Sequence, residues 1–180
     1  MKSVRKRFSI REDKKHRIEV HVAGFCFRDC AGRLQLLAGR RSKDREIFPD
    51  RWECGGGQVY AGENFEQALK RHYIEEFGIA VQIVQPLLAY EILMPDSPKI
   101  PGIKFLCTSV DNGKENIVLD ERELSDAKWV TLSQCKSLRM IPGVPEQAKV
   151  AFALARQIFA PRSKKRQSEI GFHAQPKTMS

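Results

Sequence analysis

The chain has 180 residues, 42% of them hydrophobic, which is enough for one domain with its own core. Its formal net charge of +9 lies almost entirely in the ends: residues 1–17 carry +6 and residues 161–180 carry +4, which leaves −1 for the part between them. No segment approaches the roughly 20 apolar residues that span a bilayer, and the first residues lack the apolar core of a secretory signal, so we expect a soluble, cytoplasmic protein without membrane contact.

The charge distribution predicts three parts: a basic N-terminal extension at 1–17, a folded domain over 18–160, and a basic, disordered C-terminal tail at 161–180. Neither end interleaves aromatic residues of the kind that stack on bases, so we expect nucleic acid to make only nonspecific contacts with the tails. The five cysteines form no CxxC pair, which favours reduced, mostly buried thiols over zinc or disulfides.

A hairpin is predicted at the start of the domain, with strands over 18–27 and 34–37 joined by a turn that contains Gly32. The polar stretch 40–50 predicts a loop, and three consecutive glycines, 55–57, predict irregular structure. The first part of the domain is therefore expected to consist of strands and loops.

A helix is predicted over 64–77, where apolar residues recur at helical spacing between a capping Asn64 and a terminating Gly78. The remaining predicted elements are strands at 81–90 and 103–110, a loop between them that contains Pro95, Pro98 and Pro101, a turn at 111–113, an extended segment at 129–130 and a closing helix over 145–160. This interleaving predicts an α/β fold with a mixed sheet flanked by helices.

Three polar residues of the predicted helix, His72, Glu75 and Glu76, share one face within an arc of about 100°. Adjacent carboxylates repel unless a cation lies between them, and a hard divalent ion such as Mg²⁺ prefers oxygen ligands. Arg71 can hold Glu75 or a phosphate, and the glycine run can bring backbone groups close to a metal or a diphosphate. The alternative is a solvated acidic helix face that follows an ordinary turn.

The spacing of these residues resembles the motif of the Nudix hydrolases, in which Gly, Glu, Arg-Glu, Glu-Glu and Gly recur at fixed intervals. The positions that match are Gly57, Glu63, Arg71, Glu75, Glu76, Gly78 and Ile79. The flanks are similar to the family as well: Leu36-Leu37 with Arg40-Arg41, the approach over 48–53, and an acidic segment over 123–129.

The resemblance implies a Nudix-type α/β/α sandwich with a mixed β-sheet between helices. It also implies a metal-dependent hydrolase that cleaves a diphosphate linkage in a nucleotide-type small molecule. In this chain the Gly57 carbonyl, Glu75, Glu76 and Glu123 would hold Mg²⁺ or Mn²⁺. Glu63 and Arg71 would orient the metal-binding acids.

His72 departs from the motif, because the family has a Glu directly after the Arg. A nitrogen ligand suits magnesium poorly, so we expect weaker metal binding or a preference for manganese. Imidazole has an ordinary pKa near 6.5, so His72 either accepts a proton from water or marks a relaxed site. Two alternatives to the hydrolase therefore stay open: a catalytically weak nucleotide-binding or regulatory domain, and a scaffold whose basic tails are the working surface.

Arg40 and Arg41 are candidates for phosphate contacts, and Phe48 and Trp52 are candidates for stacking on a base. The alternatives are solvated arginines and a tryptophan of the core. Nucleoside triphosphates, ADP-ribose-like compounds and dinucleoside polyphosphates stay open as substrates, and so does a homodimer.

Overall fold

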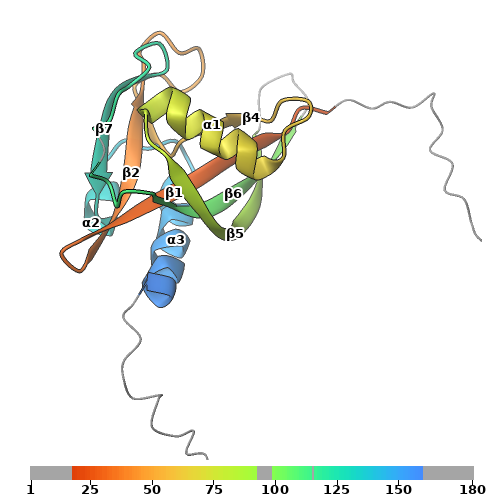
Figure 1. The fold of residues 1–180 in the computed structure, drawn as a ribbon. Helices are drawn as coiled ribbons and strands as arrows, with labels where there is room; N and C mark the ends of the chain where they lie inside the picture. Colours follow the sequence, from red (N-terminus) through yellow and green to blue (C-terminus); the bar gives the residue numbers. More distant parts are fainter. Residues whose placement is uncertain (1–17, 93–98, 115, 160–180) are drawn as a thin grey trace, which may run out of the picture.

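The structure is a computed structural model that describes residues 18–92, 99–114 and 116–159 (Figure 1). The predicted basic extension at 1–17 and the predicted tail at 161–180 lie outside the described residues. Within the described part of the chain, no helix is long and apolar enough to cross a membrane.

One mixed sheet forms the centre of the molecule. Its strand order is β3-β2-β1-β6-β5, with β4 paired to β1 and β7 paired to β2. Only the β1 and β6 pair is parallel among these pairings. The strands are β1 (His21–Cys30), β2 (Arg33–Arg41), β3 (Trp52–Glu53), β4 (Gly56–Gln58), β5 (Val81–Ile92), β6 (Ile100–Ser109) and β7 (Leu124–Val130).

The helix α1 (Phe65–Phe77) begins and ends where the sequence predicts. The Asn64 side chain accepts a hydrogen bond from the Gln67 amide at 2.9 Å, and the Gln67 side chain accepts one from the Asn64 amide at 2.9 Å. This reciprocal capping box satisfies two donors that the first turn would otherwise leave without partners. Gly78 then ends the helix with a left-handed φ of 68°.

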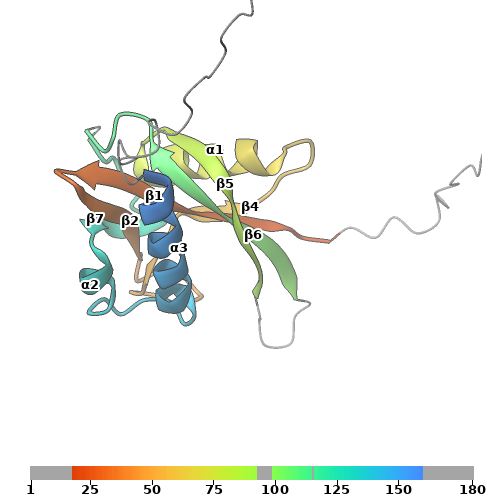
Figure 2. The ribbon, with the colours of Figure 1, turned by 90° about the horizontal axis from the view of Figure 1, so that it is seen from below.

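Helices cover both faces of the sheet, as the two views show (Figures 1 and 2). Successive side chains of β1 point to opposite faces, so Val22 and Cys26 pack with α1 while Phe25 packs with α3 (Val144–Phe159). Phe27 meets Phe152 of α3 edge to face, with ring centroids 4.8 Å apart. The predicted α/β/α sandwich with a mixed sheet is confirmed.

Three local predictions are wrong or incomplete. The glycines at 56 and 57 do not form an irregular loop, because they belong to β4, which pairs with β1. Pro101 lies within β6 and not in the preceding loop. The short helix α2 (Leu132–Cys135) was not predicted. Four of the five cysteines are buried, as expected.

Candidate functional site

A large cavity opens between the acidic face of α1, the strand β4 and the sheet face that α3 covers. Its volume is about 1440 Å³. It is lined by residues from most of the predicted site and by several others, among them His21, Arg41, Phe48, Glu53, Gly57, His72, Glu75, Glu76, Tyr90, Lys104, Glu123 and Gln147. The fold therefore brings the loop, helix and acidic segment of the predicted site to one place.

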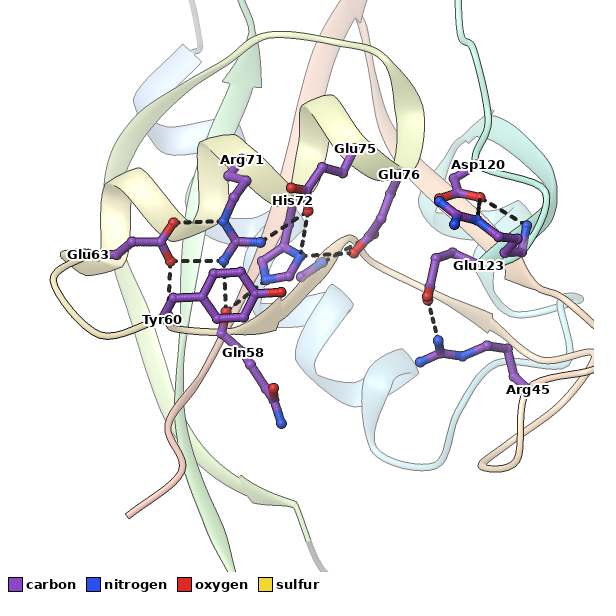
Figure 3. A network of polar contacts seen from close by, with 12 residues as sticks. Arg45, Gln58, Tyr60, Glu63, Arg71, His72, Glu75, Glu76, Asp120 and Glu123 are labelled. Atoms are coloured by element: carbon purple, nitrogen blue, oxygen red, sulfur yellow. Dashed lines mark hydrogen bonds and ion pairs between the residues drawn. The ribbon is translucent and has the colours of Figure 1, made fainter. Parts of the chain in front are cut away.

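Arg71 is the centre of a rigid set of contacts on the outer side of α1 (Figure 3). Its guanidinium donates to both Glu63 carboxylate oxygens, at 2.7 and 2.8 Å, and to Glu75 at 3.0 Å. It also donates to the Gln58 carbonyl at 3.0 Å and lies 4.0 Å from the ring centroid of Tyr60. These bonds to Arg71 lower the pKa of Glu63 from its ordinary value of 4.5 to about 2. Arg71 and Glu63 thus fasten α1 to the chain around β4.

The two adjacent carboxylates of α1 have different surroundings. The Glu75 side chain is 53% exposed and is held by Arg71, whereas the Glu76 side chain is 13% exposed. The Gly56 amide donates to Glu76 at the long distance of 3.4 Å. Burial raises the pKa of Glu76 well above its ordinary value, and the negative charges of Glu53 and Glu123 add to the rise. Glu76 is therefore a buried acid that forms no ion pair with a Lys or Arg among the described side chains, and only the more distant charge of Arg41 lowers its pKa.

His72 is nine-tenths buried against β4. Its Nε2 lies 2.9 Å from the Gln58 carbonyl oxygen. A carbonyl only accepts, so Nε2 carries the proton and the Nδ1 of the neutral ring is left as an acceptor. Nδ1 lies 3.5 Å from Glu76 Oε1. Burial is the main cause that lowers the pKa of His72.

Gly57 is required by the position of the His72 ring. A β-carbon at Gly57 would lie 2.1 Å from the Cε1 atom of His72, so the ring or the backbone would have to move. The ring therefore lies against Gly57, whose carbonyl the resemblance assigns to the metal.

Glu123 reaches the site from the segment before β7. That segment is fastened to the end of α1, because the Val118 amide donates to the Phe77 carbonyl at 2.9 Å and the Asp120 amide donates to the Glu76 carbonyl at 3.3 Å. The Glu123 carboxylate forms an ion pair with Arg45 at 2.5 Å (Figure 3). A cation that binds Glu123 would compete with Arg45.

The described residues contain no group of three or more His, Cys, Asp or Glu side chains close enough to hold a metal ion together. The predicted ligands all line the cavity: Glu75, Glu76 and Glu123. However, Glu75 forms an ion pair with Arg71, and Glu123 forms one with Arg45. Their chemistry suits a hard divalent cation, since they offer carboxylate oxygens and, among the described residues, no Lys or Arg forms an ion pair with the buried Glu76. Bringing them together requires side-chain rearrangement.

Two of the four predicted substrate contacts reach the cavity and two do not. Arg41 lines it while bonded to Glu53 at 2.6 Å, and Phe48 lines it with a positive φ of 50°, a strained conformation for an aromatic residue. Trp52 is 6% exposed and belongs to the core, so it has no free ring face for a base. Arg40 is outside the cavity lining and pairs with Asp50 at 2.7 Å. Neither residue therefore lines the cavity, and the core and solvated alternatives fit Trp52 and Arg40 better.

Several cavity residues escaped the sequence analysis. His21, Tyr90 and Lys104 come from three different strands, and Glu53 follows Trp52 in β3. Only the register of the strands brings the first three to one face of the sheet. His21 and Tyr90 both pair with Gly102, and Lys104 follows Gly102 by two residues in β6. No local motif marks such a set.

These features define an α/β/α sandwich protein with a carboxylate-lined cavity at the end of one helix. Residues 18–153 match the family model described as NUDIX domain, and the chain belongs to this family.

The chain is also similar to named relatives. It is 28% identical over 106 residues to an uncharacterized Nudix hydrolase of Listeria monocytogenes, covering 58% of this chain and 60% of that protein. It is 32% identical over 100 residues to the human NAD-capped RNA hydrolase NUDT12, covering 56% of this chain and 20% of that protein. The match thus spans from a fifth to three fifths of the length of these curated relatives.

Solved structures share the fold at low sequence identity. An Ap4A hydrolase of C. elegans, solved as a binary complex, aligns with a TM-score of 0.65 and 18% identity, covering 78% of this chain and 99% of that chain. At this identity the likeness supports the architecture only.

Proposed function

We propose that this chain hydrolyses a phosphoanhydride bond in a nucleoside diphosphate derivative and that it uses Mg²⁺ or Mn²⁺. The observation that carries the proposal is Glu76, a buried carboxyl whose pKa is raised and which faces a large cavity together with Glu53 and Glu123. Such an arrangement is costly unless a cation or a proton compensates it, and perturbed carboxylates of this kind are concentrated at functional sites. Membership of the Nudix family supports the same reaction class.

In this proposal the metal is held by Glu75, Glu76, Glu123 and the carbonyl of Gly57. When bound, the ion would neutralise phosphate oxygens and lower the pKa of a coordinated water. Release of Glu75 from Arg71 and of Glu123 from Arg45 would free two carboxylates for it. Both ion pairs are partly exposed, so exchanging them costs little.

The substrate is hydrolysed by water, whose oxygen forms a bond to phosphorus as the bridging P–O bond breaks. Arg41 lies at the cavity wall and can donate to phosphate oxygens. Phe48 is 41% exposed and presents an aromatic ring to the same space, where it can stack on a base. Arg71 and Glu63 act as positioning residues, because they face each other and hold α1 in place.

A second function, nucleotide binding with slow or no hydrolysis, is favoured by one specific observation. His72 packs over Gly57 and bonds to the Gln58 carbonyl, so the position that holds a Glu in the family motif contributes no carboxylate here. A site with one charge fewer binds a divalent cation less tightly. A regulatory or binding domain could retain the cavity without the metal.

The two proposals are separated by a panel of nucleotides incubated with Mg²⁺, with Mn²⁺ or with EDTA. The panel contains a nucleoside triphosphate, ADP-ribose and a diadenosine polyphosphate, with products resolved by chromatography. Turnover with a metal and none with EDTA supports the hydrolase. Thermal stabilisation by a nucleotide without any product, in either metal, would support the binding domain and contradict hydrolysis.

A further inference from the structure

The ammonium group of Lys104 is buried in the cavity wall without an acidic partner. The residue is 6% exposed and lines the cavity. Its Nζ donates to Gln147 Oε1 at 2.7 Å and lies 5.2 and 4.9 Å from the ring centroids of Phe25 and Tyr90. Among the described residues no carboxylate forms an ion pair with it. A buried ammonium is costly without a complementary group, so Lys104 is prepared to donate to a ligand.

The Lys104 ammonium offers donors only. Lysine has three donors and no acceptor, and the Gln147 oxygen already accepts one of them. The Gln147 amide nitrogen has no hydrogen-bond partner among the described residues. The nearby Tyr90 hydroxyl is engaged with His21 Nδ1. The Lys104 ammonium therefore suits an oxygen that accepts hydrogen bonds and is mismatched to an amino group.

The place of Lys104 in the sheet sets its distance from the carboxylates. Lys104 is in register with Ala23 of β1, and Ala23 is in register with Gly56 of β4, whose amide meets Glu76. Two strand spacings of about 4.8 Å separate the Lys104 and Gly56 backbones by roughly 10 Å. A ribose can bridge such a distance between a diphosphate at Glu76 and a base at Lys104.

The surroundings of Lys104 suit a flat ring better than a second phosphate. The cavity lining near α3 is apolar, with Ala23, Ile141, Pro142 and Val144. Apolar walls with a few converging polar groups are typical of sites for heteroaromatic ligands. A phosphate would call for more than one cation.

We propose that Lys104 and Gln147 bind the keto oxygen of a nucleobase, and that they select hypoxanthine, guanine or uracil over adenine or cytosine. The inference rests on the proposed function, in which the diphosphate lies at the Glu76 end of the cavity. Selectivity arises because an amino group in place of the keto oxygen cannot accept a hydrogen bond from the buried Lys104 ammonium.

Equilibrium binding of inosine and adenosine monophosphate tests the inference, because the two bases differ at the purine 6-position, which is keto in one and amino in the other. Uridine and cytidine monophosphate provide a second pair. Calorimetric titrations use the native chain, Lys104→Met, and the control Lys128→Met, which removes an exposed lysine outside the cavity lining. We expect the native chain and Lys128→Met to bind the keto member of each pair about tenfold or more tightly. Lys104→Met should lose this preference while its affinity for adenosine monophosphate stays the same.

Equal affinities of the native chain for inosine and adenosine monophosphate would overturn the inference, whatever the variants do. So would an equal loss for both ligands in Lys104→Met, which would indicate a phosphate contact. Gln147→Leu repeats the comparison should Lys104→Met not fold. If the native chain prefers the keto ligands but hydrolyses no nucleotide, the result contradicts the proposed hydrolase and leaves the inference about Lys104 and Gln147 standing.

Discussion

The imidazole of His72 lies directly over the α-carbon of Gly57, and its Nε2 donates to the carbonyl of the next residue, Gln58, at 2.9 Å. This contact connects α1 to β4 at the centre of the candidate site. It gives His72 a positioning role that the motif alone does not reveal.

Gly57→Ala should destabilise the chain by about 1–3 kcal/mol, because the new methyl group would overlap the His72 ring and force it away from Gln58. Urea denaturation measures the loss. The cost should shrink in a His72→Ala background, where the ring is absent. Equal costs of Gly57→Ala in both backgrounds would show that the two residues do not interact as described.

His72→Glu should raise turnover and tighten metal binding, because it restores a carboxylate next to Glu75 and Glu76. The control His72→Gln keeps an N–H donor for the Gln58 carbonyl without adding charge, and should give no rise. Steady-state kinetics in Mg²⁺ and Mn²⁺ compare the three proteins. A fall in turnover for His72→Glu would show that the imidazole itself takes part in the reaction.

The helix and its caps were predictable, and the strand β4 was not. The signals for α1 are local, since Asn64 and Gly78 enclose one run of helical periodicity. Gly56 and Gly57 become a strand only because β1, more than 30 residues earlier, supplies hydrogen-bond partners. A run of glycines has no side-chain pattern from which such pairing could be inferred.

The residues of the candidate site also fall into those that the sequence predicts and those that it does not. The motif indicated Glu63, Arg71, Glu75 and Glu76 because all four are close in sequence on one loop and one helix. Lys104 was missed because its significance depends on Gln147 in α3, which it meets only in the folded chain. The place of Trp52 was left open for a similar reason, because a tryptophan beside a strand has the same local sequence whether it faces the core or the cavity.

The stability of the chain should fall as the pH decreases from 6.5, partly through His21. Burial is the main cause that lowers its pKa from 6.5 to about 4. Between these values the unfolded chain binds a proton that the folded chain does not, so this contribution is complete above pH 6.5 and is lost toward pH 4. The change between pH 7 and pH 5 is about 2 kcal/mol.

His21→Gln removes this titration and retains a polar partner for Tyr90. The free energy of unfolding, measured by urea denaturation at pH 7 and pH 5, should change less in the variant than in the native chain. The same pH dependence in both proteins would rule out His21 as a source.

Arg45→Ala should strengthen metal binding, because Arg45 occupies the Glu123 carboxylate in the absence of a cation. The two side chains are 36% and 42% exposed, so the ion pair is weak and the gain should be no more than about fivefold in affinity. Titration with Mn²⁺, followed by electron paramagnetic resonance, measures it. Arg122→Ala, which disrupts the exposed pair with Asp120, is the matched control. Weaker Mn²⁺ binding in Arg45→Ala alone would contradict competition for Glu123.

The central claim is that Glu76 belongs to the catalytic centre of a metal-dependent hydrolase, and Glu76→Gln tests it most directly. The substitution keeps the shape of the buried side chain and removes a charge that burial disfavours, so the thermal denaturation midpoint should not fall below that of the native chain. With the best nucleotide of the panel and the preferred metal, we expect turnover to fall by roughly a hundredfold or more. A folded Glu76→Gln protein with native turnover would contradict the account.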